Sequence, residues 1–321
     1  MQRRPRFHGT CVSQPETPSL VSVLIPLYNH ARYVTRCLES VLEDGYPRVE
    51  ILIIDDGSKD DSAALARYWY EGTDALRIER FELESCPNKG VIRTLNQLVA
   101  KARGEYVILL ASDDFLLPGG IATRLEYLRM NPHKIAVFGD CIVVDDGGTK
   151  THDSGIVDLY GGHIKCLLND DLLALELICN WCVPGPGFMA RRELYERIGL
   201  YDESLTIEDW DMYLRIAAAG LLGFIPGPVA AYRYHGENSV LNEQMRSSQL
   251  DSIMRTAWKN HRAFQGIHRF GLLYKYFKVK QDTAVELGHR MKGYINRRIS
   301  KLLYRLSIQR YKKIVENLDA G

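Results

Sequence analysis

The sequence lacks an apolar run that could cross a membrane. A spanning helix needs about 18 or more consecutive apolar residues, and no stretch of the 321 residues approaches that length without interruption. Residues 1–19 also lack the apolar core of a secretory signal. We therefore expect residues 1–19 to form a loose polar arm and the protein to be cytoplasmic.

The cysteine pattern of a disulfide-stabilised protein is also missing. The seven cysteines are odd in number and scattered along the chain, which favours reduced thiols. Cys179 and Cys182 form a lone C-x-x-C pair, with no second pair to complete a zinc site and no thioredoxin-like surroundings. We interpret both as packing residues rather than as a metal or redox centre.

Acidic and basic residues nearly balance over the whole chain, with a net charge of +1, but they are unevenly distributed. From Arg255 to the end, 16 Lys and Arg stand against four acids, a net charge of +12. The remaining 25 basic and 36 acidic residues carry a net charge of −11. The pattern indicates an acidic body with a basic tail.

No internal repeat or low-complexity segment is present, and short apolar runs alternate with helical stretches. This alternation predicts βαβ units and a Rossmann-like α/β fold, with a mostly parallel sheet flanked by helices. The predicted strands are 21–26, 49–54, 76–81, 106–110, 135–144, 188–191, 221–225 and 229–234. The predicted helices are 32–42, one that follows Asp61, 91–102, 118–130, 167–179, one between Arg191 and Ile198, 205–219 and most of the chain from 242 onward. Asn29 is expected to cap the first helix.

Acids cluster at three turns of this predicted fold. They are Asp55 and Asp56, Asp113 and Asp114, and the group Glu208, Asp209 and Asp211. Open α/β sheets bind ligands beyond the carboxyl ends of their strands, and carboxylate oxygens there suit Mg²⁺ or Mn²⁺ holding a nucleotide diphosphate. The alternative is that the acids cap helices, with Asp114 capping the helix that follows Pro118.

Five motifs stand in order between residues 21 and 215. They are Val-Ser-Val-Leu-Ile-Pro-Leu-Tyr-Asn (21–29), Glu-Ile-Leu-Ile-Ile-Asp-Asp-Gly-Ser-Lys-Asp (50–60), Asn-Lys-Gly (88–90) with Asn96, Gly-Glu-Tyr-Val-Ile-Leu-Leu-Ala-Ser-Asp-Asp (104–114) and Glu-Asp-Trp-Asp-Met-Tyr-Leu-Arg (208–215). In this combination the chain resembles the inverting family-2 glycosyltransferases of the GT-A fold, in the broad bacterial group that makes cell-surface polysaccharide. The resemblance implies an arm at 1–19, a GT-A catalytic domain at 20–240 and a basic helical region at 241–321.

The resemblance implies a nucleotide-sugar donor and places several residues against it. Pro26 and Tyr28 match the turn that packs around the nucleotide base, and Asp56 matches the carboxylate that accepts a hydrogen bond from the base. The imide N–H of uracil suits that carboxylate, which favours a UDP-linked sugar. Arg93 lies near the position from which the family reaches the donor with a basic residue. Asp113 matches the residue beside the ribose.

A metal ligand and a catalytic base are implied in the same way. Residues 112–114 correspond to a D-x-D-like signature with Ser at its first position, and Asp114 matches the ligand of a divalent cation, Mn²⁺ or Mg²⁺. His235 either closes over the diphosphate, completes the shell of that metal or is a surface histidine of a loop. Asp209 matches the base that removes the proton of the acceptor hydroxyl, with Asp211 as its rival two residues away.

The implied reaction is hexose transfer to an acceptor hydroxyl, in the synthesis of cell-surface polysaccharide or glycolipid. The basic C-terminal helices suit peripheral contact with the anionic inner face of the membrane and a lipid-linked acceptor; alternatively they pack on the acidic body or make a homo-oligomer. No nucleic-acid-binding motif accompanies the charge. The competing functions are a sugar nucleotidyltransferase, whose Gly-rich loop after the first strand is missing, and a non-catalytic scaffold with the same fold.

Overall fold

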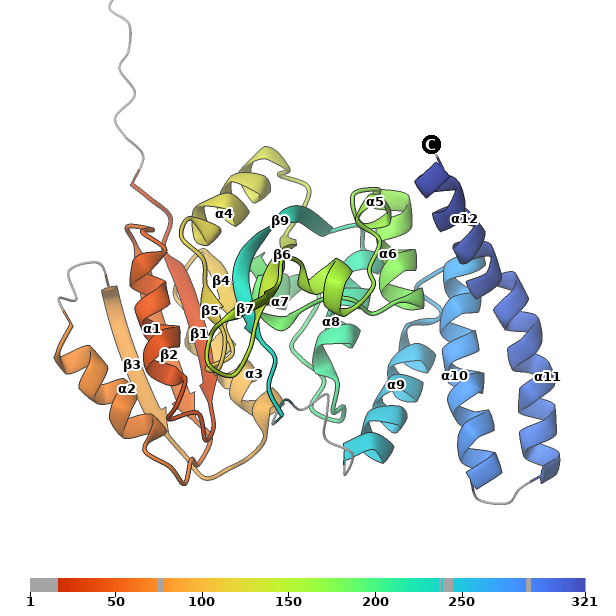
Figure 1. Ribbon diagram of the computed structural model, residues 1–321, viewed down its shortest axis with the longest axis horizontal. Coiled ribbons are helices and arrows are strands. Elements are labelled where there is room, and N and C mark those ends of the chain that lie inside the picture. The colour runs from red at the N-terminus through yellow and green to blue at the C-terminus, as the bar shows by residue number, and fades with distance from the viewer. Residues whose placement is uncertain (1–16, 74–77, 237, 239–244, 287–289, 321) are drawn as a thin grey trace, which may run out of the picture.

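The computed structural model describes residues 17–73, 78–236, 238, 245–286 and 290–320. A twisted sheet with flanking helices forms the larger part of the molecule, and the C-terminal helices stand beside it at one end (Figure 1). Most of the predicted arm, residues 1–16, lies outside the described residues, as does the predicted domain boundary at 240.

The described part of the chain forms one sheet of nine strands. The strands are β1 (Val21–Leu27), β2 (Val49–Asp55), β3 (Ile78–Ser85), β4 (Tyr106–Leu109), β5 (Phe115–Leu116), β6 (Ala136–Val144), β7 (Lys150–His152), β8 (Phe188–Arg191) and β9 (Leu222–Arg233). Their order is β3-β2-β1-β4-β8-β6-β9-β5, with β7 paired to β6. The first four strands of this order run parallel, whereas β8 is antiparallel to both of its neighbours.

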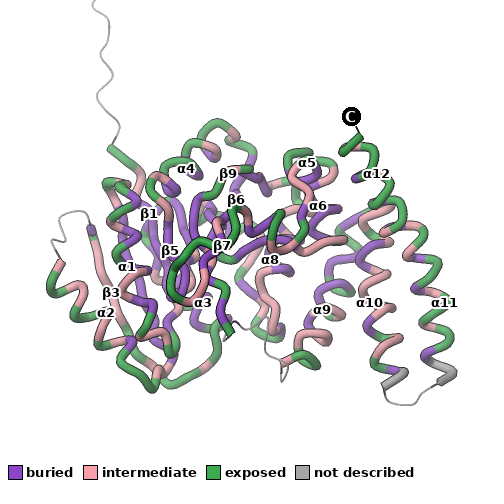
Figure 2. The backbone as a smooth tube through the Cα atoms, viewed as in Figure 1, coloured by how far each residue is buried: buried purple, intermediate pink, exposed green. Residues whose placement is uncertain are grey.

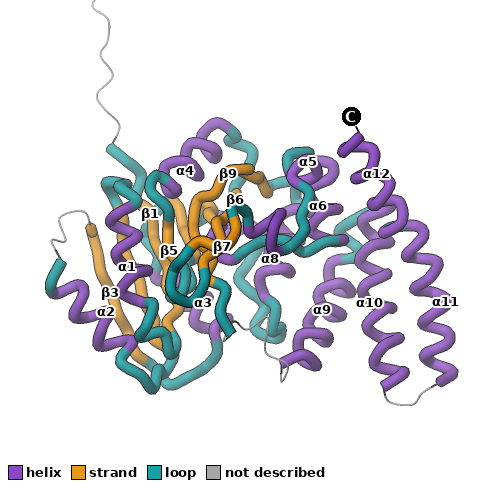
Figure 3. The backbone as a smooth tube through the Cα atoms, viewed as in Figure 1, coloured by secondary structure: helices purple, strands orange, loops and turns teal. Residues whose placement is uncertain are grey.

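Helices cover both faces of the sheet (Figure 3). They are α1 (Val34–Glu43), α2 (Ser62–Glu71), α3 (Val91–Lys101), α4 (Gly120–Met130), α5 (Ile164–Leu167), α6 (Asp170–Cys179), α7 (Leu194–Arg197), α8 (Glu208–Ala218), α9 (Arg246–Asn260), α10 (Gly266–Glu286), α11 (Arg290–Leu306) and α12 (Ile308–Ala320). One apolar core joins the sheet to α1 and α4, and a second joins the opposite face to α3, α6 and α8. The strands between these cores are buried on both faces, which is why their sequences read as continuous apolar runs.

The turn after β4 differs from the prediction. The short strand β5 follows Asp114 directly and pairs with β9, so α4 begins only at Gly120 and Asp114 is not its cap. Asp44 takes that role from the end of α1, since its Oδ2 accepts the Ile121 N–H at 2.9 Å. The cap prediction for Asp114 is therefore wrong, because two strand residues and a turn separate it from the helix.

Asn29 does not cap the first helix either. It has a positive φ of 53°, and its Oδ1 accepts the Lys59 N–H at 2.8 Å. The residue before α1 is Tyr33, whose side chain makes no capping hydrogen bond. Asn29 instead ties the loop after β1 to the loop after β2.

The two strands predicted at 221–225 and 229–234 are one long strand, β9. Its pairing with β6 shifts register on both sides of Asp140. Pro226 and Pro228 lie at this irregularity, and proline lacks the N–H that a regular ladder requires. The prolines therefore bend the strand without ending it.

The C-terminal helices pack on the acidic body through α6 and α8. Trp210 and Leu214 of α8 share an apolar cluster with Ala257 of α9 and Leu272 of α10. Lys259 of α9 reaches two acids of the body, Asp202 and Asp211. The basic tail thus neutralises part of the acidic body, and Figure 2 shows that these helices carry buried as well as exposed residues.

No helix in the described ranges is both long enough and apolar enough to cross a membrane. Cys182 is fully buried in the core with residues of α3 and α8, and Cys179, the last residue of α6, packs against the C-terminal helices. Burial raises the pKa of the Cys179 thiol to about 12 and that of Cys182 further. Both thiols are thus protonated at neutral pH and act as small packing groups.

Candidate active site

The loops after β1, β2 and β4 meet at the carboxyl ends of these parallel strands. The His30 N–H donates to Ser62 Oγ at 2.8 Å, which joins the first loop to the start of α2. The His30 ring joins it to the third loop, because Nδ1 lies 2.8 Å from Ser112 Oγ. Two of the predicted acidic turns therefore border one edge of the sheet, as the topology of an open α/β sheet requires.

Asp56 is buried and organises the loop that leads into α3. Its Oδ1 accepts the Lys89 N–H at 2.8 Å and its Oδ2 accepts the Gly90 N–H at 2.9 Å. Gly57 must be glycine, since its φ is +79° and a Cβ there would lie 2.8 Å from the Asn88 nitrogen. Among the predicted base-contacting residues, Pro26 is half-buried in β1 and Tyr28 is exposed just beyond it.

The neighbouring acids Asp113 and Asp114 have different surroundings. Asp114 is 2% exposed, and its Oδ1 accepts the Arg233 N–H at 2.7 Å. Burial, reinforced by the charge of Asp113, raises the pKa of Asp114 well above its usual value. Asp113 instead faces two histidines, with Oδ2 at 3.1 Å from His235 Nε2 and Oδ1 at 3.9 Å from His30 Nδ1.

The histidines change the protonation of Asp113. Burial opposes its ionisation, but the hydrogen bond with His235 and the charge of His30 outweigh burial, and the pKa of Asp113 is lowered. The pKa values of the two neighbouring acids thus shift in opposite directions. Only Asp113 places its carboxylate oxygens beside imidazole nitrogens.

His235 is 7% exposed and therefore is not a surface histidine. Its ring lies 5.1 Å from that of Tyr33 and 6.3 Å from that of His30. The backbone N–H of His235 donates to Asn238 Oδ1 at 2.5 Å. These contacts hold the segment after β9 over Asp113.

Arg233, which the sequence analysis did not select, organises this cluster. Its Nε donates to the Asp113 carbonyl at 2.8 Å, and one terminal nitrogen donates to the carbonyls of Asp145 and Asp146 at 3.0 and 2.9 Å. The guanidinium lies 4.8 Å from the centre of the Tyr33 ring. Arg233 is a charged residue at the end of the apolar run of β9, two positions before His235. This placement is the sequence signal that could have indicated its role.

Asp209 lies in the first turn of α8 and is partly buried, next to Glu208. Burial raises the pKa of Asp209 to about 6. Burial and the charge of Asp209 together raise the pKa of Glu208 to about 8. At pH 7 Asp209 is therefore largely ionised and Glu208 largely protonated.

Tyr160 lies within electrostatic range of both Asp114 and Asp209. Burial is the main cause that raises the pKa of Tyr160; Tyr234, Asp114 and Asp209 add to it, and the hydrogen bond with Tyr232 opposes it. Its hydroxyl lies 3.3 Å from that of Tyr232 on β9. Both acids thus act electrostatically on one tyrosine, although Asp209 makes no hydrogen bond or ion pair with Asp113 or Asp114 within the described residues.

Asp211 has a separate role, in attaching α8 to α9. It is fully buried; its Oδ2 lies 2.9 Å from Arg215 Nε and 3.0 Å from Lys259 Nζ. Its Oδ1 accepts from Asn260 Nδ2 at 2.8 Å. Asp211 is thus surrounded by donors, whereas within the described chain Asp209 makes no ion pair.

Arg93 does not join the acidic cluster. Its side chain is exposed, and its Nε lies 3.1 Å from Glu203 Oε2. Asn96, one turn further along α3, donates to the Tyr201 carbonyl and accepts the Tyr201 N–H, both at 3.0 Å. These contacts fix the segment that leads from Tyr201 into α8, the helix that carries Asp209.

We expect Asp211→Ala to lower the free energy of unfolding by about 3 kcal/mol, since it leaves buried donors on two helices without their acceptor. Urea denaturation followed by circular dichroism measures this change. Asp251→Ala is the matched control, because its pair with Arg255 has the same spacing on a helix but is exposed. The control should change stability by less than about 1 kcal/mol; equal losses in the two variants would contradict the attachment role.

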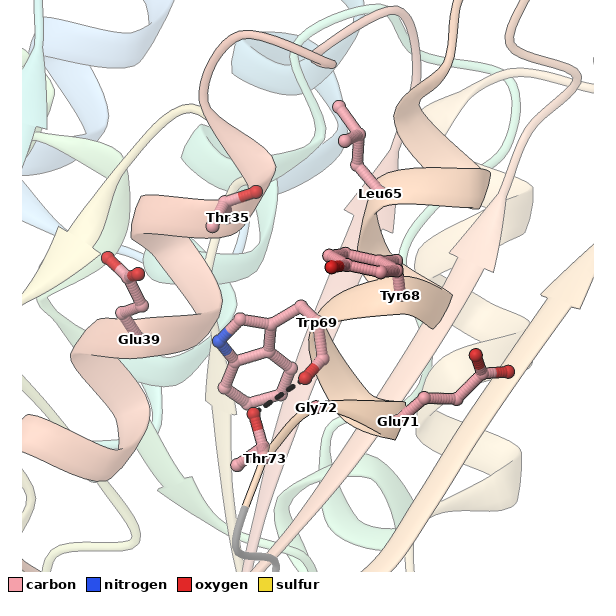
Figure 4. Close-up of a pocket in the computed structure, with 8 residues that line it drawn as sticks. All are labelled: Thr35, Glu39, Leu65, Tyr68, Trp69, Glu71, Gly72 and Thr73. Carbon is pink, nitrogen blue, oxygen red and sulfur yellow. Dashed lines mark hydrogen bonds between the residues drawn. The ribbon is translucent and has the colours of Figure 1, made fainter.

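A groove of about 560 Å³ lies elsewhere, between α1 and α2. Figure 4 shows it lined by Trp69 and Tyr68, with Thr35 and Glu39 on the opposite helix. None of its lining residues is a predicted site residue. The chemistry suggested by the acids therefore does not depend on this groove.

The chain belongs to glycosyl transferase family 2, whose model matches residues 22–199. It is therefore a glycosyltransferase, which settles the choice against a nucleotidyltransferase or a non-catalytic scaffold. An uncharacterized protein of Mycobacterium tuberculosis (strain CDC 1551 / Oshkosh) is 28% identical over 236 residues, 72% of each chain. The chondroitin synthase of Escherichia coli is 28% identical over 225 residues, which cover 70% of this chain but only 30% of the synthase.

Solved structures confirm the predicted GT-A fold. TarS 1-349 of S. aureus has a TM-score of 0.62 at 14% identity, covering 94% of this chain and 87% of that one. The mannosyltransferase PcManGT of Pyrobaculum calidifontis, solved with GDP-Man and Mn²⁺, has a TM-score of 0.59 at 18% identity, covering 96% and 81%. TarS 1-349 has also been solved with UDP-GlcNAc. At these identities the likeness concerns the fold alone.

Proposed function

We propose that the protein transfers a sugar from a nucleoside-diphosphate donor, UDP-linked, to an acceptor hydroxyl with inversion at the anomeric carbon. The observation that carries the proposal is the buried pairing of Asp113 with His235 at the turn that follows β4. The donors bound to TarS and PcManGT support the donor class. The synthase relative supports a role in cell-surface polysaccharide or glycolipid synthesis.

We assign the divalent cation, Mn²⁺ or Mg²⁺, to Asp113 and His235. A carboxylate oxygen and an imidazole nitrogen 3.1 Å apart suit Mn²⁺, and the lowered pKa of Asp113 keeps its oxygens available. No cluster of three or more His, Cys, Asp or Glu in the described ranges could hold a metal, so diphosphate oxygens and water would complete the shell. The cation would supply positive charge to the departing diphosphate.

This assignment changes the roles first expected of the two acids. Asp114 matches the metal ligand by sequence, but its Oδ1 already accepts the Arg233 N–H and the carboxyl group is buried. In this position Asp114 acts as the acceptor that fixes the end of β9. We therefore place Asp114 behind the site, and Asp113 on the cation rather than on the ribose.

Asp209 is the general base of the proposal. A base must be ionised at working pH yet basic enough to take the hydroxyl proton, which a pKa of about 6 provides. Inversion requires the acceptor to attack from the face opposite the leaving diphosphate, so the base and the cation act on opposite sides of the sugar. Asp56, Pro26 and Tyr28 would hold the nucleotide base of the donor. Arg93 would lie at the edge of the donor site.

A donor screen tests the proposal. With Mn²⁺ present, UDP and UDP-sugars at about a hundred times their Kd should raise the Tm by about 5 °C, because they bind only the folded state. Chelation of the metal should remove most of the shift. A Tm shift with GDP but not with UDP would contradict only the choice of uracil as the nucleotide base. No Tm shift with any nucleotide or nucleotide-sugar would contradict the proposed function.

A further inference from the structure

Helix α11 has a continuous exposed face, and in Figure 1 it is the outermost helix at the end of the molecule opposite α2 and β3. At about 100° per residue, its exposed side chains fall on one side of the helix. We call these residues the outer face of α11: Tyr294, Ile295, Arg297, Arg298, Lys301, Leu302 and Arg305. The other side contacts α10, where Ser300 Oγ donates to Gln281 Oε1 at 2.9 Å and Leu303 is buried.

The charge of α11 has a single sign. Its 17 residues include six basic side chains, at positions 290, 292, 297, 298, 301 and 305, and no acid. The four on the outer face make no ion pair with any acid whose side chain the structure describes. By contrast, Lys278 on α10 is paired with Asp282 and Lys259 on α9 with two acids of the body. The four cations of the outer face are thus available to a partner.

Large apolar side chains are interleaved with these cations. Tyr294, Ile295 and Leu302 are 55%, 52% and 59% exposed, and the Arg298 guanidinium lies 5.0 Å from the centre of the Tyr294 ring. An acidic protein or a nucleic acid would neutralise the cations but would not require the aliphatic side chains. A partner that satisfies both groups has dense negative charge at its surface and hydrocarbon a few ångströms below it.

We propose that the outer face of α11 docks on an anionic lipid bilayer. Basic residues at the edge of a helix that lies in the interface reach lipid phosphates, while apolar residues enter the region between headgroups and acyl chains. The long stems of Arg and Lys follow the apolar surface and keep their charges at the phosphates. The docking needs neither the sugar donor nor the cation, so it can be tested apart from the proposed reaction.

Co-sedimentation of the full chain with vesicles tests the proposal. The wild type should bind vesicles of phosphatidylcholine with phosphatidylglycerol in low salt and should not bind phosphatidylcholine alone. Arg298→Glu/Lys301→Glu/Arg305→Glu should lower the apparent affinity for anionic vesicles about tenfold or more. Ile295→Ser/Leu302→Ser should bind in low salt but be released by added salt more readily than the wild type, because only the electrostatic part remains.

The matched control is Arg67→Glu/Arg103→Glu/Arg129→Glu, which makes the same change of net charge at exposed positions of the catalytic domain. It should bind vesicles nearly as well as the wild type. Equal losses in the two triple variants would show that only net charge matters and would overturn the proposal. So would a wild type that binds no anionic vesicle, or one that self-associates through α11 in sedimentation velocity without binding lipid. Unchanged Tm and UDP binding verify that each variant is folded.

Discussion

Asp209→Asn is expected to lower kcat by about 10²- to 10⁴-fold, the usual contribution of a positioned general base. The amide has nearly the shape of the carboxylate but cannot take the acceptor proton. Binding of donor and cation should persist, because Asp209 makes no contact with Asp113 or His235. Steady-state rates together with calorimetric titration of UDP and Mn²⁺ separate the two effects. Retained turnover would move the base to another residue.

Glu208→Gln is the matched control for this substitution. Glu208 precedes Asp209 on the same helix turn, and its pKa of about 8 keeps it protonated at pH 7. Glutamine resembles that neutral form, so turnover at pH 7 should remain within a few-fold of the wild type. A loss as large as that of Asp209→Asn would assign the proton transfer to Glu208 or to the pair acting together.

The pH dependence of the rate follows from the same acid. Asp209 accepts a proton only when ionised, so kcat/KM should be nearly constant above its pKa of about 6. Below that pH the carboxyl group protonates, and kcat/KM should fall about tenfold per pH unit. A pH–rate profile measured with saturating Mn²⁺ shows this acidic limb. A profile that stays flat well below pH 6 would contradict the assignment of Asp209 as the base.

The fold could be predicted from the sequence where the pattern is local. The buried strands β1, β2, β4 and β6 appear as apolar runs, and the helices between them as amphipathic stretches. In each case the positions that are buried follow directly from the local geometry of the strand or helix. β5 was missed because a strand of two residues is too short to show a periodic pattern in the sequence. Its pairing with β9 also depends on residues more than 100 positions away. Asp44 as the cap of α4 was missed for the same reason: its partner, the Ile121 N–H, is distant in sequence.

The site was predictable to the extent that its acids follow strands. Sequence placed Asp113, Asp114, Asp209 and His235 at turns, and the topology brings the turns of Asp113, Asp114 and His235 together. It did not distinguish Asp113 from Asp114, because adjacent residues of a turn point in different directions and only the packed structure shows which one meets Arg233 or His235. The contributions of Tyr33, Arg233 and Tyr160 came from tertiary contacts that no local motif records.

The isosteric pair Asp113→Asn and Asp114→Asn is expected to separate the metal ligand from the structural acceptor. Asp113→Asn removes a negative charge from the proposed ligand, and we expect Mn²⁺-dependent UDP affinity to fall about 10- to 100-fold, in line with the loss of a supporting group at a metal site. Asp114→Asn keeps an oxygen that can accept the Arg233 N–H. Its carboxyl group already has a strongly raised pKa, so the affinity should change little. Isothermal titration of UDP with and without Mn²⁺ measures both.

The opposite result, with affinity lost in Asp114→Asn and kept in Asp113→Asn, would restore Asp114 as the ligand. Asp114→Ala adds a check on stability: it leaves the buried Arg233 N–H without its acceptor and should lower the free energy of unfolding by about 1–3 kcal/mol.

His235→Ala should weaken Mn²⁺-dependent binding as Asp113→Asn does. If both residues hold one cation, the double variant should lose less affinity than the two single losses combined, because each change removes much of the same interaction. Strictly additive losses would instead mean that Asp113 and His235 act on the donor independently.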